Sequence, residues 1–497
     1  MSEPQNAMTA EEAFNLAVKH QTEGRLDEAR SLYDRLLDAF PGHPLVLRSR
    51  GYLEIGRGRF ELGKQDLEQA LSASPDSNSD TAILMLNLGA VYLHLKQLDL
   101  AVKVLERSAK MDPEQPETLS NLGEAYRRLD RFEEAERHFR AALKLARANN
   151  IDVRKVRGIQ FNLALTLEKL SAADESSALF LDVWRHEPQN LKYALSARGQ
   201  LALRCAWDEL QKADSVILGL KTAPESIEDN TIVAHYLPEF RQQDLRKISE
   251  AHCRAAYSHF NPADLDRSGA MPRAVDARLR VGYLLADARN HANGYNTVLL
   301  FGKHDRQRFE VFVYSTGPND HGWVRAQIER EAEHFVDLFG QTNSDIAQRI
   351  HEDRIDVLVD LMGHTSMTRL GALAYRPAPI QITWLGYPGT TGASFVDYII
   401  GDPVVTPDDA FEGYTERIIR LPHTYQINNL QTYALKEAPT RSSLGLPEKE
   451  FVFCCFNNPN KLNRERFTAW MRILKACPGS VLWLNTGLEE ARHNLQQ

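Results

Sequence analysis

Four short segments in the second half of the chain contain residue types suited to contact with a charged, polar ligand. His291 follows the apolar run LRVGYLLA, on a strand-to-helix loop where a polar group would face a cleft. MGHTSMTR (362–369) follows a second apolar run. LGYPGTTG (385–392) is a glycine- and proline-rich loop whose backbone could lie close against a sugar. Lys461 stands before the helix expected in RERFTAWMRILKAC, where its charge and the helix N-terminus suit a phosphate group.

Each of these signals also has a plainer structural explanation. A single histidine on a loop is usually a surface residue, and a glycine- and proline-rich loop is usually only a turn. His351 lies in a charged helical segment, where a solvated side chain is an equal alternative to a functional one. The signals gain weight together because we expect all of them at one edge of a predicted sheet.

The elements that would position these residues alternate between strands and helices from Leu279 onward. Continuous Val, Ile and Leu runs joined by helical segments indicate a parallel sheet covered on both faces. Ligands of such sheets bind beyond the carboxyl ends of the strands. The expected strands are 279–286, 309–316, 334–339, 355–363, 380–389, 396–402 and 451–456, and the expected helical stretches include TVLLFGKHD, VRAQIEREAE and DIAQRIHED.

The first half of the chain repeats itself about every 34 residues, the period of tetratricopeptide helical hairpins. Gly89 and Gly123 are 34 residues apart, as are Leu105 and Phe139. Small residues mark where the two helices of a hairpin touch, and large apolar residues fill the groove to the next one. Units at 10–43, 44–77, 82–115, 116–149 and a degenerate 157–190 follow, with Ala17, Gly51 and Ala164 as further small residues and Pro41, Pro75, Pro113 and Pro188 closing the units. Stacked hairpins form a superhelix with a concave groove that binds peptides or partner proteins.

Composition sets broad limits on the class of protein. Charged residues make up 25% and hydrophobic residues 43% of the 497 residues, as in ordinary globular proteins of two or three domains. The net charge of −8 argues against a nucleic-acid binder. The five cysteines form no CxxC pair, so no zinc site is expected, and adjacent Cys454 and Cys455 are expected to be buried thiols. We find no secretory signal and no apolar run long enough to cross a membrane, and expect a cytoplasmic protein.

RPAPIQITWLGYPGTTGASFVDYIIGD (376–402) resembles the signature run of the intracellular protein O-GlcNAc transferases, a family that includes SPINDLY-type relatives from plants. RVGYLLADARNH, DVLVDLMGHT, RLPHTY and an FNN…K element (456–461) match in the same order, and the resemblance covers about 278–485. A tetratricopeptide array ahead of this module is the family's usual arrangement. The implied fold is the two-lobed GT-B glycosyltransferase architecture, with the active site between two Rossmann-like lobes.

The resemblance implies transfer of GlcNAc from UDP-GlcNAc to Ser or Thr hydroxyls of intracellular proteins, with inversion and without a metal. No cofactor is implied, since the nucleotide sugar is a co-substrate, and the acceptor proteins or peptides would bind through the tetratricopeptide groove. His291 and His351 match two family histidines proposed as the base, and Lys461 matches the lysine that contacts the diphosphate. The other matched positions are the nucleotide-sugar contacts Leu385, Gly386, Tyr387, Pro388, Thr390, Thr391 and Asn458, with His364 on the acceptor side.

Departures from the family pattern leave the sugar donor open. Tyr295 replaces a histidine often found four residues after His291, so a relay through that position is absent. His364 and Asn458 resemble the SPINDLY branch, which uses GDP-fucose, whereas Gly389 resembles the O-GlcNAc branch. The donor is therefore UDP-GlcNAc or, as the alternative, GDP-fucose.

The C-terminal lobe is expected to be incomplete. In the family this lobe continues well beyond the position of EEARHNLQQ and contains a His-Thr-Thr-Gly-type loop that grips the nucleotide. A fragment, a truncated gene or a separate chain would each explain the difference, and a third alternative is a non-catalytic tetratricopeptide binding scaffold. The expected domains are tetratricopeptide repeats at 1–190, a bridging helical segment at 191–275, an N-terminal catalytic lobe at 276–440 and the start of a nucleotide-sugar lobe at 441–497.

Overall fold

The computed structural model divides the chain into two units, Met1–Glu187 and Pro188–Gln497. It describes residues 8–74, 79–170, 172–226, 231–266, 277–387, 389–428 and 439–497. Among the residues discussed above, Pro75 and Pro388 lie outside the described ones.

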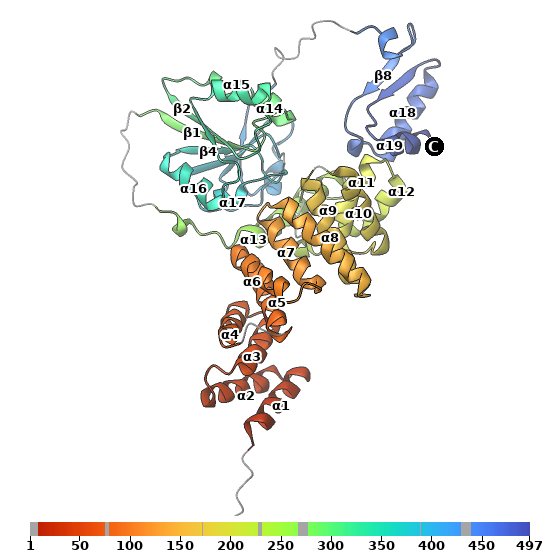
Figure 1. The fold of residues 1–497 in the computed structure, drawn as a ribbon. Coiled ribbons are helices and arrows are strands. Elements are labelled where there is room, and N and C mark those ends of the chain that lie inside the picture. The colour runs from red at the N-terminus through yellow and green to blue at the C-terminus, as the bar shows by residue number, and fades with distance from the viewer. Residues whose placement is uncertain are drawn as a thin grey trace, which may run out of the picture. The chain divides into compact units, whose positions relative to one another are not determined.

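The first unit consists of helical hairpins, as the 34-residue repeat predicts (Figure 1). The helices are α1 (Ala10–Thr22), α2 (Leu26–Ala39), α3 (Pro44–Gly56), α4 (Phe60–Ser72), α5 (Ser79–His94), α6 (Leu98–Met111), α7 (Pro116–Arg128), α8 (Phe132–Ala148), α9 (Val153–Lys169) and α10 (Ala173–His186). Within each hairpin the small residue of the first helix lies against a large residue of the second. A Cβ on Gly89 would lie 2.4 Å from the Leu105 side chain, and one on Gly123 would lie 2.8 Å from the Phe139 ring. The small and large positions of the repeat are therefore packing partners.

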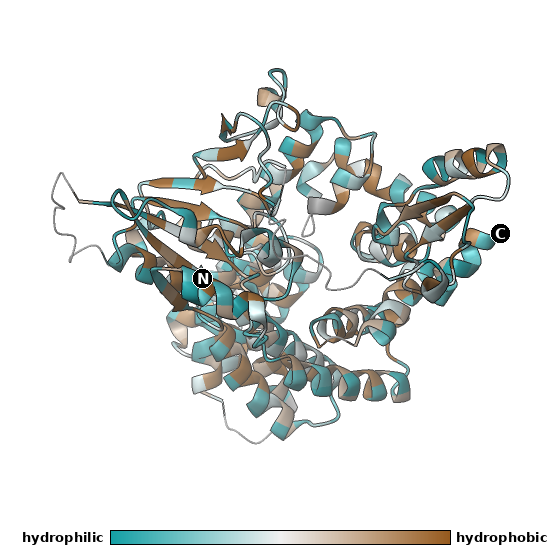
Figure 2. Ribbon diagram, turned by 90° about the horizontal axis from the view of Figure 1, so that it is seen from above, coloured by the Kyte–Doolittle hydropathy of each residue, from teal (hydrophilic) through white to brown (hydrophobic). Residues whose placement is uncertain are grey.

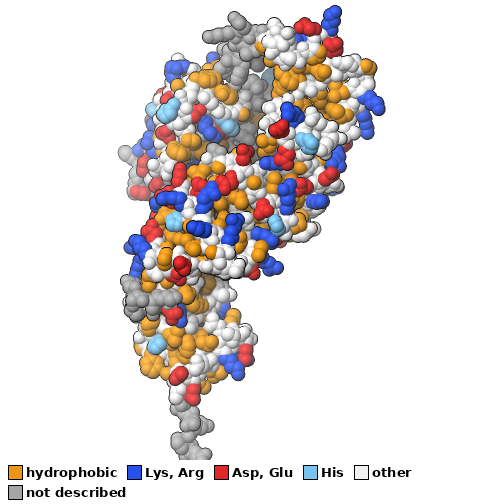
Figure 3. Space-filling view, turned by 45° about the vertical axis from the view of Figure 1, so that its right-hand side comes forward, with side chains coloured by type: hydrophobic (Ala, Val, Ile, Leu, Met, Phe, Trp, Pro, Cys, Tyr) orange, Lys and Arg blue, Asp and Glu red, His pale blue; other side chains and the backbone are white. Residues whose placement is uncertain are grey.

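Ion pairs connect successive hairpins on the surface of this unit. Arg140 on α8 contacts Glu175 on α10 over 2.7 Å, and Lys155 on α9 contacts Glu117 on α7 over 3.0 Å. Figure 3 shows basic and acidic side chains interspersed on the surface, and exposed pairs of this kind contribute little to stability.

The second unit begins with a further helical hairpin, α11 (Leu191–Leu203) and α12 (Trp207–Ile217). Its turn contains Cys205 with a φ of 51°. The same left-handed turn occurs in earlier hairpins at Gly24, Gly58, Lys96 and Asp130. The sequence predicts two helices here but no repeat, although the turn has the same backbone conformation as those of the earlier hairpins. The 3-10 turns η1 (Leu218–Lys221), η2 (Pro224–Ser226) and η3 (Thr231–Tyr236), helix α13 (Gln242–Tyr257) and the turn η4 (Pro262–Asp264) follow.

A seven-stranded parallel sheet forms the main body of the second unit, with strand order β3-β2-β1-β4-β5-β6-β7. The helical first half followed by a parallel α/β sheet confirms the predicted fold class. The strands are β1 (Leu279–Leu285), β2 (Phe309–Ser315), β3 (His334–Asp337), β4 (Val357–Asp360), β5 (Ile380–Thr383), β6 (Tyr398–Gly401) and β7 (Arg417–Arg420). β7 was not predicted, because RIIR is short and flanked by charges.

Two apolar cores cover the two faces of this sheet. The strands are largely hydrophobic along their length (Figure 2). Because side chains alternate along a strand, Val311 and Val313 of β2 enter one core and Phe312 and Tyr314 the other. The covering elements are α13, α16 (Asn343–Glu352) and α17 (Leu370–Ala374) on one face, and α14 (Ala292–Thr297), η5 (Phe301–Lys303) and α15 (Trp323–Glu331) on the other. The helix predicted in TVLLFGKHD is instead the short α14, which begins earlier with His291 at its N-cap position, followed by η5. The turn η6 (Ala410–Gly413) precedes β7.

A second, two-stranded parallel sheet follows near the end of the chain, with β8 (Val452–Cys455) and β9 (Val481–Leu484). The turns η8 (Ser442–Leu444) and η9 (Pro459–Lys461) and the helices α18 (Arg464–Ala476) and α19 (Glu489–Gln496) accompany it. The prediction that Cys454 is buried is wrong: its side chain is exposed. The pleat turns it away from the apolar cluster, into which partly buried Cys455 packs with Cys205 of the α11–α12 turn.

The described helices include none that is both long and apolar enough to cross a membrane.

Candidate active site

Three loops meet at the carboxyl edge of the seven-stranded sheet, where the strand order reverses between β1 and β4. The loop after β1 reaches the loop after β4 through Asn293, whose Nδ2 donates to the Leu361 carbonyl over 2.9 Å. The loop after β5 packs on the same segment, since a Cβ on Gly386 would lie 2.2 Å from the Leu361 oxygen. Parallel sheets bind ligands at such reversals. The structure therefore brings His291, His364 and the 385–392 loop to one candidate site.

His291 stands at the N-cap position of α14 and lies beside a buried carboxylate. Its Nδ1 is 3.0 Å from Oδ2 of Asp287 and 3.3 Å from the backbone nitrogen of Asn293. One Nδ1 cannot both donate to the carboxylate and accept from the Asn293 N–H. We assign a proton to Nδ1 from the shorter, charge-assisted contact, which gives up the Asn293 hydrogen bond and leaves Nε2 of the neutral ring unprotonated. The His291 side chain is 47% exposed and that of Asp287 only 7%. The pair thus has the arrangement of a general base oriented by a carboxylate.

The 385–392 loop is fixed by contacts inside the protein. Leu385 has a φ of 73°, a left-handed conformation that leucine rarely adopts. Buried Glu416 accepts hydrogen bonds from the Thr390 hydroxyl and the Thr391 backbone nitrogen, both over 2.7 Å, and from the Thr391 hydroxyl. These two hydroxyls therefore anchor the loop, and their predicted contact with a sugar stays a prediction. The predicted contact of Pro388 falls on a residue outside the described part of the chain.

His364 contacts this loop at Thr391 and Tyr387. Its Nε2 is 2.6 Å from the Thr391 carbonyl oxygen, and its ring lies edge-on to Tyr387 with centroids 5.3 Å apart. Burial lowers the pKa of His364 to about 4, so the ring is neutral at pH 7 and donates its Nε2 proton to the carbonyl. An acceptor-side role of His364 stays a prediction.

His351 is not brought to this site. It lies in the last turn of α16, and the next residues, including Asp353, contact Arg280 at the start of β1. A helix between parallel strands runs back toward their amino ends, so His351 lies at the opposite edge of the sheet from His291. The prediction that all candidate residues share one edge is therefore wrong for His351, and we assign it no part in the chemistry.

Asn458 and Lys461 lie in the turn η9 that follows β8, and both are exposed. The Asn458 side chain accepts a hydrogen bond from the backbone nitrogen of Asn460 over 3.1 Å and so caps the turn. Helix α11 packs against η9, and Arg204 pairs with Glu490 of α19 over 2.8 Å. These two residues therefore lie beside the second sheet, so the prediction of one shared sheet edge is wrong for them too, and the structure shows no contact of theirs with His291. A contact with the diphosphate stays a prediction.

Sequence reasoning missed several residues that shape the site. Asp287 precedes His291 by four residues, and this acidic position in ADARNH was a signal that could have been used. Asp360 ends β4 fully buried, and burial raises its pKa to about 6. Its carboxylate accepts from the backbone nitrogens of Met362 and Gly363 and so shapes the turn before His364. In the described part of the chain, no three His, Cys, Asp or Glu side chains are grouped so that they could hold a metal ion.

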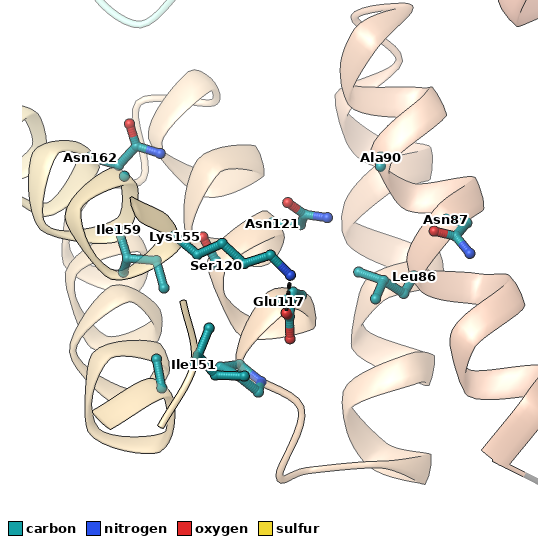
Figure 4. Close-up of a pocket in the computed structure, with 13 residues that line it drawn as sticks. Leu86, Asn87, Ala90, Glu117, Ser120, Asn121, Ile151, Lys155, Ile159 and Asn162 are labelled. Atoms are coloured by element: carbon teal, nitrogen blue, oxygen red, sulfur yellow. Dashed lines mark hydrogen bonds and ion pairs between the residues drawn. The ribbon is translucent and has the colours of Figure 1, made fainter. Parts of the chain in front are cut away.

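A groove along the helical repeats is a second candidate binding surface (Figure 4). The first helices of three successive hairpins, α5, α7 and α9, line it with Asn87, Asn121 and Asn162. The Asn87 amide donates to the Tyr52 hydroxyl over 2.9 Å. Leu86 and Ile159 supply apolar surface beside these amides. Apolar surface interleaved with amide donors and acceptors suits an extended peptide.

Comparison with known proteins gives matches along both units. The model of glycosyl transferase family 41 matches residues 265–437 and 432–496, and tetratricopeptide repeat models match 14–78, 48–116 and 116–149. SEC from Arabidopsis thaliana, described as a probable UDP-N-acetylglucosamine–peptide N-acetylglucosaminyltransferase, is 34% identical over 295 residues, covering 56% of this chain and 30% of SEC. SPINDLY from the same plant, which has the same description, is 34% identical over 207 residues, covering 41% of this chain and 22% of SPINDLY. The chain thus spans less than a third of the length of either relative.

Among solved structures, a lysine-to-methionine mutant of the O-GlcNAc transferase from Thermobaculum terrenum is similar at 22% identity and a TM-score of 0.44. The alignment covers 89% of this chain and 68% of that one.

Proposed function

This chain belongs to the tetratricopeptide-containing O-GlcNAc transferase family, glycosyl transferase family 41, and from that premise we propose that it is a protein O-glycosyltransferase. The proposed reaction transfers GlcNAc from UDP-GlcNAc to a Ser or Thr hydroxyl of a protein, with inversion and without a metal. The observation that carries the proposal is the His291–Asp287 pair at the point where the strand order of a parallel sheet reverses.

The proposed mechanism is a direct displacement at the anomeric carbon. The acceptor hydroxyl forms a bond to this carbon and gives its proton to Nε2 of His291, while the bond to the diphosphate oxygen breaks. Asp287 stabilises the imidazolium that forms, because its carboxylate lies 3.0 Å from Nδ1. Lys461 offsets the negative charge that develops on the leaving diphosphate. The backbone at Leu385 and Gly386 packs against the sugar and holds it in line.

The acceptor protein binds as an extended peptide along the groove of α5, α7 and α9. The Asn121 amide can donate to a peptide carbonyl and accept from a peptide N–H at the same time. Replacement Asn121→Ala is expected to raise the KM for a peptide acceptor and leave that for the nucleotide sugar unchanged.

GDP-fucose is a second candidate donor, which the SPINDLY-like residues His364 and Asn458 favour. Isothermal titration of the full-length protein with UDP-GlcNAc and with GDP-fucose separates the two. Tighter binding of UDP-GlcNAc, together with a mass gain of one GlcNAc on a co-incubated protein, supports the first proposal. Binding of peptides but of neither nucleotide sugar would instead identify a tetratricopeptide scaffold.

A further inference from the structure

The helical segment ahead of the seven-stranded sheet contacts the 385–392 loop through His235. Nε2 of His235, in η3, lies 2.7 Å from the Tyr387 hydroxyl. The two rings meet edge to face, with centroids 5.2 Å apart and planes at 83°. Tyr387 is 1% exposed, so this hydroxyl is removed from water and needs a partner inside the protein.

Helix α13 makes a second contact with the same loop. The Cys253 thiol donates to the Thr391 carbonyl over 3.0 Å. Gly392, with a φ of 69°, leaves room for the α13 backbone, because a Cβ there would lie 2.3 Å from the carbonyl carbon of Ser249. The loop is thus seated on η3 and α13 as well as on the strands of its own sheet.

Two glycines leave space for Tyr387 and His235, one in the loop and one in the turn after β4. A Cβ on Gly389 would lie 2.4 Å from Cε1 of His235. A Cβ on Gly363, in the turn after β4, would lie 2.5 Å from Cβ of Tyr387. The Tyr387 side chain therefore packs between the His235 ring and the Gly363 turn.

Leu385 and Gly386, which the proposed function places against the sugar, immediately precede this tyrosine. We propose that His235 is a positioning residue for the nucleotide-sugar loop: by bonding the Tyr387 hydroxyl it fixes the backbone of Leu385 and Gly386 at the carboxyl edge of β5. This inference rests on the proposed function for its link to catalysis. Its structural part, that His235 orders the loop, can be tested without any transfer activity.

The activity test compares variants that keep or remove a side-chain nitrogen at position 235. His235→Phe is expected to raise the KM for UDP-GlcNAc at least about fivefold and leave the KM for a peptide acceptor unchanged. His235→Asn keeps a polar nitrogen and is expected to restore part of that loss. If His235 acts through the hydroxyl, His235→Phe adds no further change in a Tyr387→Phe background. Equal changes in both KM values, or full additivity of the two substitutions, would overturn the proposal.

The second test measures amide hydrogen exchange of the 384–392 segment in the full-length protein. His304→Phe is the matched control, since His304, which follows η5, also bonds a buried tyrosine hydroxyl, that of Tyr283 on β1, over 3.0 Å. Faster exchange of the segment in His235→Phe alone supports the proposal. Exchange that is unchanged, or equally faster in both variants, overturns it. A wild-type protein without transferase activity would contradict the proposed function, and the exchange result would still decide the role of His235.

Discussion

The Asp287 carboxylate lies 3.0 Å from Nδ1 of His291, with the carboxylate buried and the imidazole facing outward. This relationship sets which ring nitrogen is free to accept a proton. Asp287→Asn is expected to lower kcat on the order of 100-fold, because the amide can donate to Nδ1 and so favour the wrong tautomer. Steady-state transfer kinetics measure the effect. In a His291→Ala background the same substitution should cost almost nothing, and a full additional loss there would contradict the pairing.

Lys461 is exposed in η9, so its replacement should alter chemistry without altering stability. Lys461→Met is expected to lower kcat/KM by roughly 100- to 1000-fold, since the leaving diphosphate loses a positive charge. The thermal unfolding midpoint should remain that of the wild type. Exposed Lys475 on α18 provides the matched control, and Lys475→Met should leave both quantities unchanged. A rate unaffected by the loss of Lys461 would remove this residue from the mechanism.

The helical repeats depend on close contact at their small residues. Gly123→Ala places a Cβ 2.8 Å from the Phe139 ring and is expected to lower the free energy of unfolding by about 1–3 kcal/mol. Gly158 on α9 has open space where a Cβ would lie, so Gly158→Ala should stabilise by up to about 1 kcal/mol. Urea unfolding followed by circular dichroism compares the two. Similar changes in the free energy of unfolding for both substitutions would show that the close contact of Gly123 with Phe139 does not determine stability.

Burial of neutral His364 makes stability dependent on pH. Its pKa is about 4 in the folded protein and about 6.5 in an unfolded chain, so between these values only the unfolded state binds the proton. Stability should therefore fall by about 2 kcal/mol from this group as the pH drops from 7 to 5. Asp360, whose pKa is raised to about 6, has the opposite effect on stability. As the pH falls, the folded state binds the Asp360 proton before the unfolded state does, and this group then adds stability.

His364→Gln removes the titrating group and should flatten the pH dependence of the urea midpoint relative to wild type. His235, whose pKa burial also lowers to about 4, still contributes in that variant, so some dependence should remain. Identical curves for wild type and variant would contradict the buried, neutral state of His364.

The helical repeats, the buried strands and the position of the glycine-rich loop could be predicted from the sequence, because residue spacing and apolar runs determine them. Gly89 and Leu105 recur at fixed spacing because every hairpin repeats the same contact. The apolar runs of β1 and β4 are strands because both faces of the sheet are covered. The glycine-rich loop after β5 lies where parallel sheets bind ligands. Its position directly after a predicted parallel strand was enough to place it at that edge.

The contacts that long-range folding creates could not be predicted in this way. His235 and Tyr387 are 152 residues apart, and nothing near His235 in the sequence marks it as a partner of the loop. His351 shows a different limit: residue type and family match suggested it, but the direction of α16 places it at the far edge of the sheet. Cys205 adopts a left-handed turn that only the backbone reveals.

The most direct test of the proposed glycosyltransferase activity is transfer by the full-length protein from isotope-labelled UDP-GlcNAc to a peptide or protein acceptor, followed by mass spectrometry. We predict a gain of one GlcNAc on a Ser or Thr residue, lost in both His291→Ala and Lys461→Met. Absence of transfer and of UDP-GlcNAc hydrolysis by the wild-type protein, or transfer that persists in both variants, would contradict it.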